Sequence, residues 1–322
     1  NTALTQLDLA GNQLTYLNMK NGITDQLTVF VATENSFTCI ETLDPAYATA
    51  NWTSANGNIN AGVTFDVICG AEARTHWYVA TTGSDASGSG TLASPLANIQ
   101  TAINASTDGD TVSVAAGTYT ENLVFGGKNL SLIGADSSNT IIDGDSVSQV
   151  INLWFGEDST TVIKNFTLRN GIGRQGNGSA ILMNGDDYGP KLENLCITQN
   201  YDNAITSFGS TFSLKNSRLI NNYNRSISIQ HPQLSTIDNV IISGNAYGIE
   251  VITASPTFTN VTILNNGGAG VQCYDQASPT FTNCVISNNT SSGSGGGIYS
   301  ENSSFTLDSV TVSYNTASGS GG

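Results

Sequence analysis

An asparagine recurs at nearly constant intervals through the second half of the chain, and this repeat constrains the fold more than any other feature. Five units of the form Asn-h-x-h, where h is an apolar position, begin 22, 23, 21 and 23 residues apart, at Asn194, Asn216, Asn239, Asn260 and Asn283. A second asparagine stands six residues after each start, at Asn200, Asn222, Asn245, Asn266 and Asn289. A repeat of this length is typical of solenoids, in which each unit stacks on the next.

The repeat predicts stacked coils of short parallel strands. A second strand pattern, Gly-h-x-h, lies between the asparagine units at 248–251, 270–273 and 297–300. If each coil advances by one strand spacing, Phe258 stacks on Phe281 and Ile263 on Ile286, and Cys273 and Cys284 face inward. Asparagine suits the bends because it tolerates left-handed backbone and hydrogen-bonds nearby peptide groups. We therefore expect an all-β solenoid, a right-handed parallel β-helix. The alternative, an antiparallel sandwich, does not explain the constant repeat length or the in-register asparagines.

A different repeat opens the chain. Leu4-x-x-Leu7-x-Leu9-x-x-Asn12-x-Leu14 returns 23 residues later as Leu27-x-x-Phe30-x-Ala32-x-x-Asn35-x-Phe37. This is the leucine-rich repeat pattern, in which alternating apolar residues form a strand and the asparagine turns the chain. Residues 38–70 break the pattern. Their Cys39-Ile40, Asn51-Trp52 and final Cys69 resemble the terminal cap of leucine-rich repeat proteins from Bacteroidetes-type bacteria. That resemblance implies a disulfide between Cys39 and Cys69, and the alternative is two buried thiols.

The start of the second region carries a further resemblance. Its motifs are Trp77-Tyr-Val79, Gly83-Ser-Asp85, Ser94-Pro-Leu96, Gly109-Asp-Thr111, Ala116-Gly-Thr-Tyr119 and Ile141-Ile-Asp-Gly144. They resemble the first coils of bacterial pectin-lyase-like β-helix proteins. The resemblance implies that a helix at 95–105 caps the core. We expect the end of a leucine-rich repeat domain at 1–70, a linker at 71–75, and the β-helix at 76–322, which we expect to continue beyond Gly322.

Charge and hydropathy exclude two classes of function, nucleic-acid binding and membrane spanning. Only 11% of residues are charged, and ten basic against 25 acidic residues give a net charge of −15. Nucleic acid is therefore not an expected partner, because phosphate binding needs clustered Lys and Arg. No apolar run approaches the roughly 20 residues of a membrane span. The neutral polar surface favours a secreted protein.

The expected outer faces of the coils show no catalytic groove, so the sequence predicts no catalytic residue. One outward row is Thr167, Cys196, Arg218, Ile241, Thr262, Val285 and Thr311. The other is Leu182, Thr206, Ser228, Glu250, Gln272 and Tyr299. Neither row gathers the carboxylates and bases that polysaccharide cleavage needs. Asn260 begins an Asn-x-Thr sequon, and we expect it to be too enclosed for glycosylation.

The loops and bends contain candidate ligand-binding residues of two kinds, carboxylates and tyrosines. Asp186 and Asp187, beside Tyr188 in a long loop, are candidate ligands for Ca²⁺, with a solvated turn as the alternative. Asp85 is a lesser candidate of the same kind. Tyr201 and Tyr223 follow corresponding asparagines, so we expect them to stack. Stacked rings can contact sugar faces, as can Tyr188, although they can also simply shield the coil edge.

The sequence favours a non-catalytic structural or interaction segment of a large secreted or bacterial cell-surface protein. In this hypothesis a stiff solenoid displays a polar face to glycans or other extracellular proteins, with no cofactor required. The alternative is a polysaccharide lyase or glycoside hydrolase of the pectin-lyase-like superfamily, with its site in the 171–191 loop or beyond Gly322.

Overall fold

The computed structural model describes residues 3–22, 24–70, 74–173, 177–185, 188–231 and 234–321. Its contacts divide the chain into two units, 1–112 and 113–322. The division falls within β6 (Thr111–Val114). This point lies well beyond the linker expected at 71–75, of which residues 71–73 are outside the described residues.

The first unit begins with short strands in parallel pairs. β1 (Gln6–Asp8) pairs with β2 (Val29–Val31), and β3 (Cys39–Glu41) pairs with β4 (Thr64–Asp66). The 3₁₀ helix η1 (Thr24–Gln26) precedes β2. The helix α1 (Pro45–Asn51) begins with Pro45 in its first turn, and the Asp44 side chain accepts a hydrogen bond from the Tyr47 N–H at 2.9 Å. Proline and an aspartate cap both favour a helix start at this point.

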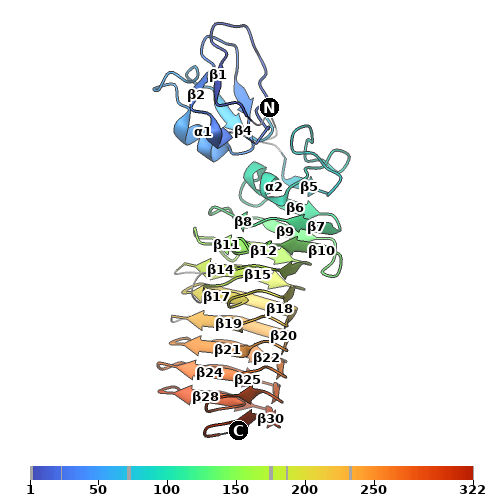
Figure 1. Ribbon diagram of the computed structural model, residues 1–322, viewed down its shortest axis with the longest axis vertical. Coiled ribbons are helices and arrows are strands. Elements are labelled where there is room, and N and C mark those ends of the chain that lie inside the picture. Colours follow the sequence, from blue (N-terminus) through green and yellow to red (C-terminus); the bar gives the residue numbers. More distant parts are fainter. Residues whose placement is uncertain are drawn as a thin grey trace. The chain divides into compact units, whose positions relative to one another are not determined.

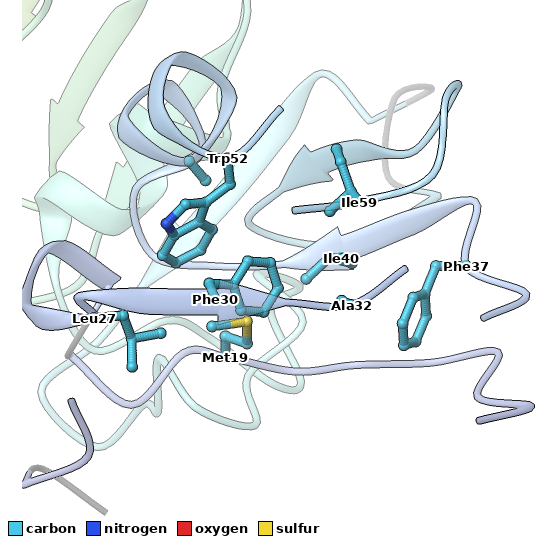
Figure 2. Close-up of a cluster of buried hydrophobic side chains, with 9 residues drawn as sticks. Met19, Leu27, Phe30, Ala32, Phe37, Ile40, Trp52 and Ile59 are labelled. Carbon is cyan, nitrogen blue, oxygen red and sulfur yellow. The ribbon is translucent and has the colours of Figure 1, made fainter. Parts of the chain in front are cut away.

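Asn35 joins one repeat to the next, as a bend asparagine should. Its side-chain amide donates to the Leu9 and Ala32 carbonyls at 2.9 and 3.2 Å, and its oxygen accepts from the Leu14 N–H at 3.1 Å. In the same segment, buried apolar side chains from β2, β3, α1 and the loops between them form a small core (Figure 2). The rings of Phe30 and Trp52 lie 4.4 Å apart in that core.

The end of this segment is held by a covalent bond and a buried ion pair. Cys39 and Cys69 form a disulfide, with their Cα atoms 5.8 Å apart. Lys20 Nζ lies 2.9 Å from Glu41 Oε2, and both residues are buried. Glu41 also accepts a hydrogen bond from the Tyr16 hydroxyl at 3.1 Å.

The rest of the first unit contains β5 (His76–Val79) and α2 (Ile99–Ala105). The helix predicted at 95–105 begins four residues late, because Leu96 pairs with β5 in extended conformation: its N–H donates to the Tyr78 carbonyl at 2.9 Å. Asp85 Oδ1 accepts hydrogen bonds from the Ala97 and Asn98 N–H groups, so this carboxylate ties its loop to the residues that precede α2.

The second unit is a stack of parallel strands in two sheets (Figure 1). Its first sheet contains β7 (Gly117–Thr120), β9 (Ser131–Gly134), β10 (Thr140–Asp143), β12 (Val162–Lys164), β13 (Thr167–Arg169), β15 (Tyr188–Glu193), β16 (Cys196–Thr198), β18 (Thr211–Ile220), β20 (Thr236–Ser243), β22 (Thr257–Thr259), β23 (Thr262–Leu264), β25 (Thr280–Thr282), β26 (Val285–Ser287), β29 (Thr306–Asp308) and β30 (Thr311–Ser313). The second sheet contains β8 (Leu123–Val124), β11 (Ile151–Leu153), β14 (Ile181–Asn184), β17 (Ile205–Phe208), β19 (Arg225–Gln230), β21 (Tyr247–Ile252), β24 (Val271–Tyr274) and β28 (Ile298–Glu301). A small pair, β27 (Thr290–Ser291) and β31 (Thr316–Ala317), lies in the last coils.

Strand register follows the repeat. Phe258 is the partner of Phe281 and Ile263 of Ile286, and the two phenylalanine rings stack 4.6 Å apart. Cys273 and Cys284 are buried in the core, as predicted. The parallel pairing excludes an antiparallel sandwich.

The two asparagine columns differ in environment. The first column (Asn194, Asn216, Asn239, Asn260 and Asn283) forms exposed bends with φ between 51° and 54°. The sequence expectation that Asn260 is enclosed is therefore wrong, because the left-handed corner turns its side chain outward. The second column (Asn200, Asn222, Asn245, Asn266 and Asn289) is buried. Each buried side chain binds the backbone of neighbouring coils, as Asn245 does through Leu219 O and the Asn222 N–H.

Candidate functional site

The outer row of the first sheet shows little chemistry. Arg218, Ile241, Val285 and Thr311 are exposed, and no carboxylate interrupts the row. Cys196 was expected to face solvent, but its side chain is only 8% exposed. It is a free cysteine, and it is buried in β16.

Four of the six residues in the outer row of the second sheet are buried, and Gln272 and Tyr299 are half-buried, contrary to the simple expectation of a solvated face. Leu182, Thr206, Ser228 and Glu250 are all buried, although they alternate along their strands with core residues such as Ile227 and Ile249. Alternation places them on the outward side of the sheet. A polar network connects Ser228, Glu250, Gln272 and Tyr299 of this row to neighbouring side chains. We call its residues the second-sheet face, and they are Arg225, Ser228, Gln230, Glu250, Gln272, Tyr274, Tyr299 and Glu301.

One half of the second-sheet face is organised around Glu250. Register places Glu250 opposite Ser228, whose hydroxyl donates to Glu250 Oε2 at 2.8 Å. Arg225 Nε lies 3.0 Å from Glu250 Oε1 as an ion pair, and its guanidinium carbon lies 5.2 Å from the centre of the Tyr247 ring. Gln230 Nε2 donates to the Ser228 hydroxyl at 3.0 Å. Glu250 Oε2 therefore accepts a hydrogen bond, and Oε1 faces Arg225, whose Nε makes no hydrogen bond with the described residues.

The other half contains two tyrosines and an amide. Gln272 is the strand partner of both Glu250 and Tyr299. Its Nε2 donates to the Tyr274 hydroxyl at 3.1 Å, and the Tyr299 hydroxyl donates to Glu301 Oε2 at 3.0 Å. The two tyrosine rings lie 5.6 Å apart at 48°. Gln272 Oε1 is buried and accepts no hydrogen bond from the described residues.

The tyrosine hydroxyls remain neutral on this face. Burial raises the pKa of Tyr274, and the charge of Glu250 raises it further against the opposing effect of Arg225. The hydrogen bond to Glu301 raises the pKa of Tyr299. Both groups therefore keep their proton at neutral pH and can donate as well as accept.

Tyr201 and Tyr223 stack as expected, with ring centres 5.1 Å apart and planes 29° apart. They are 50% and 58% exposed in the bends that lead to β17 and β19. Beside them, Asn224 Nδ2 donates to Asp202 Oδ1 at 3.0 Å. These two rings form an exposed aromatic platform.

The candidate calcium ligands Asp186 and Asp187 lie outside the described residues, as does the side chain of Tyr188. Among the residues that the structure describes, no three His, Cys, Asp or Glu side chains are grouped to hold a metal ion. No described helix is long and apolar enough to cross a membrane.

The sequence-based prediction placed Ser228, Glu250, Gln272 and Tyr299 in an outward row but did not include Arg225, Gln230, Tyr274 or Glu301. Tyr274 and Glu301 stand two residues after Gln272 and Tyr299, so the period of two along a strand places them on the same side. Extending each row by two residues would have found them. Arg225 precedes the regular pattern. Register places it beside Tyr247, and its ion pair with Glu250 is visible only in the tertiary structure.

The comparisons with known proteins concern the fold. A family model described as a right handed beta helix region matches residues 179–322. The search of curated proteins finds no match. Among solved structures, pectate lyase Pel9A is similar at a TM-score of 0.57 and 14% identity, over 76% of this chain and 78% of that one. A rhamnogalacturonan lyase is similar at 0.56 and 15%, over 76% and 74%. Residues 179–322 thus match a right handed beta helix region, and the chain shares a right-handed parallel β-helix fold with these two lyases.

Proposed function

We propose that this chain is a non-catalytic interaction segment whose second-sheet face binds glycans. The observation that supports this most is the pair of neighbouring rings Tyr274 and Tyr299, whose hydroxyls are hydrogen-bonded to Gln272 and Glu301. Rings that pack on sugar faces and polar groups that orient hydroxyls are what carbohydrate recognition requires. The exposed platform of Tyr201 and Tyr223 would extend the same surface.

Stacked coils suit a rigid display surface. Each coil contacts its neighbours, so the strands of the second sheet keep a constant spacing of about 4.8 Å. The fold is shared with a pectate lyase and a rhamnogalacturonan lyase, which are named for polysaccharides. That likeness adds support for a glycan ligand.

The proposal also covers the domains of the chain and its location in the cell. Residues 1–70 would be the end of a leucine-rich repeat domain with its cap, and α2 would be the amino-terminal cap of the β-helix. The protein would be secreted or displayed on a bacterial cell surface. The disulfide between Cys39 and Cys69 supports this location, because disulfides persist in oxidising compartments.

A glycan array tests the binding proposal. We expect the purified chain to bind a defined set of oligosaccharides, and the double substitution Tyr274→Ala with Tyr299→Ala to reduce binding at least tenfold. Tyr314→Ala is the matched control, because Tyr314 is 84% exposed and lies outside the second-sheet face. Unchanged binding in the double variant would place the ligand elsewhere, and absence of any bound glycan would overturn the proposal.

A lyase or hydrolase is the alternative, because lyases share the fold. Incubation with acidic and neutral polysaccharides, with and without Ca²⁺, separates the two functions. We expect no unsaturated products and no new reducing ends. Products that disappear in Glu250→Gln would assign catalysis to the second-sheet face.

A further inference from the structure

The first unit contains a buried tryptophan with an unused hydrogen-bond donor. Trp52, the C-cap of α1, is only 4% exposed, yet its indole N–H donates no hydrogen bond to the described residues. Trp77 is equally buried, at 2%, but its Nε1 donates to Asp110 Oδ2 at 3.1 Å. Because a buried indole N–H usually has a partner of this kind, the donor of Trp52 is available to a ligand.

A cavity adjoins this donor. It has a volume of about 330 Å³ and lies between β2, α1 and the loop at 56–58. We call it the Trp52 pocket; it is lined by, among others, Leu27, Val29, Tyr47, Asn51, Trp52 and Asn56. Figure 2 shows the indole nitrogen on the Leu27 side of the ring, away from Ile59, which lines a different cavity. Ligand pockets span roughly 300–1,000 Å³, so this one accommodates a single ring-sized unit.

The Trp52 pocket combines two aromatic rings with uncharged polar groups. The Tyr47 and Trp52 rings meet edge to face, with centres 6.2 Å apart and planes at 89°. Asn51 Nδ2 donates to the Tyr47 carbonyl at 2.9 Å, and neither Asn51 Oδ1 nor the Asn56 side-chain amide makes a hydrogen bond with the described residues. Among those residues, no charged side chain lines the pocket. An ion would lose hydration there without gaining an ionic partner, so the pocket favours an uncharged ligand that donates and accepts.

We infer that the Trp52 pocket binds the acetamido group of an N-acetylhexosamine. The amide oxygen accepts from Trp52 Nε1, and the methyl group beside it packs on Leu27. The sugar ring lies against Tyr47, and its hydroxyls reach Asn51 and Asn56. A plain hexose has no group that supplies both the carbonyl and the methyl. A peptide supplies both but lacks a ring of hydroxyls. This site is separate from the second-sheet face, and the inference does not depend on binding there.

The indole N–H signals of the ¹⁵N-labelled full chain test the site directly. The chain has three tryptophans, and Trp52→Phe identifies the signal of Trp52 by its loss. The probes are N-acetylglucosamine, glucose, glucosamine and N-acetylalanine amide. We expect N-acetylglucosamine to shift the Trp52 signal to saturation, and the other three to bind about tenfold more weakly or less, because each lacks the acetamido group or the sugar ring. The Trp77 signal should stay in place, since its N–H is already hydrogen-bonded.

Two substitutions locate the ligand by saturation-transfer NMR of N-acetylglucosamine. Trp52→Phe keeps an aromatic ring but removes the donor, and Val29→Lys places a long charged side chain at an exposed position of the pocket, where Val29 is 40% exposed. Each should weaken binding about tenfold. Val124→Lys, at a strand valine that is 41% exposed in β8, is the matched control and should bind as the native chain does. The Trp77 signal shows whether the first unit of each variant is folded.

Each contrary result has a definite meaning. A Trp52 signal that glucose or glucosamine shifts as strongly as N-acetylglucosamine would overturn recognition of the acetamido group. An equal response to N-acetylalanine amide would make the pocket a peptide site. The absence of any shift, or unchanged binding in both folded variants, would show that the sugar does not occupy the pocket. All of these leave binding at Tyr274 and Tyr299 untouched, because that face is tested by its own double variant.

Discussion

Asn239 and Asn245 stand six residues apart in one coil and are used in opposite ways. Asn239 is exposed at a left-handed corner with φ of 54°, and its side chain donates only to Asn216 Oδ1, at 2.8 Å. Asn245 is 2% exposed, and its amide donates to the Leu219 carbonyl and to Asn266 Oδ1, both at 3.0 Å. Its oxygen accepts from the Asn222 N–H at 2.9 Å. The exposed column shapes the bend, and the buried column satisfies backbone groups.

Asn245→Ala should therefore be strongly destabilising. It leaves the Asn222 N–H and the Leu219 carbonyl buried without their partner, which we expect to cost about 3 kcal/mol of unfolding free energy. Asn239→Gly is the matched control, because glycine keeps the left-handed backbone, and its cost should stay below about 1 kcal/mol. Guanidinium denaturation of both variants measures the difference. Equal losses would contradict the division between the two columns.

Cys273 provides a second prediction at the residue scale. Burial raises the pKa of its thiol from 9.0 to about 12. In the unfolded chain the thiol ionises above pH 9, but in the folded chain it keeps its proton, so its contribution to stability is complete below pH 9 and is lost as pH rises toward 12. At pH 10.5 the free energy of unfolding should be about 2 kcal/mol lower for this reason.

Cys273→Ala removes this linkage. Denaturation at pH 8 and pH 10.5 should show the native chain losing about 2 kcal/mol more than the variant over that interval. Between pH 6 and 8 the difference between the two proteins should stay constant. The thiol should also resist alkylation at pH 9 until the chain unfolds. A parallel decline of both proteins at alkaline pH would show that other groups dominate.

The pairing of strands makes each coil depend on its neighbours. Phe258 in β22 and Phe281 in β25 are fully buried, and their rings are nearly parallel, at 8°. Each ring fills space for the coil above and the coil below. A change in one strand should therefore weaken its neighbours, as expected for a solenoid with nearest-neighbour coupling.

Phe281→Ala should cost about 4 kcal/mol of unfolding free energy, because it removes a buried ring and leaves a cavity between coils. Phe281→Leu should cost less than about 1.5 kcal/mol, because it retains most of the apolar volume. Phe305→Ala is the control, since that ring is already 37% exposed in the last coils. Thermal denaturation should rank the three variants in this order, and a loss at Phe305 equal to that at Phe281 would contradict the role of stacking.

At the scale of the whole molecule, two units with different means of stabilisation share one chain. The first has a small core, a buried ion pair between Lys20 and Glu41, and the Cys39–Cys69 disulfide. The second, in its described residues, has the stacked core of the parallel strands and free buried thiols. We expect two unfolding transitions rather than one.

Removing the disulfide should affect the first unit selectively. The bond spans 30 residues, and a loop of that length corresponds to about 3–4 kcal/mol of stabilisation through the unfolded state. Cys39→Ser with Cys69→Ser should lower the first transition by about that amount and leave the second unchanged, as monitored by the fluorescence of the buried Trp52 and by far-UV circular dichroism. Cys196→Ser is the control for thiol loss. A single transition, or an equal shift of both, would show that the units unfold together.

The periodic pattern by itself determined the right-handed parallel β-helix, the inward stacks and the bend asparagines, because each depends on spacing along the chain. Tertiary structure alone decided which asparagine column is buried, why α2 begins at Ile99 rather than Pro95, and that Arg225, Glu250 and Tyr274 share one face. These outcomes depend on contacts between coils. A linear pattern specifies which side of a strand a residue takes, but side chains from neighbouring coils decide whether that side is solvated, paired or covered.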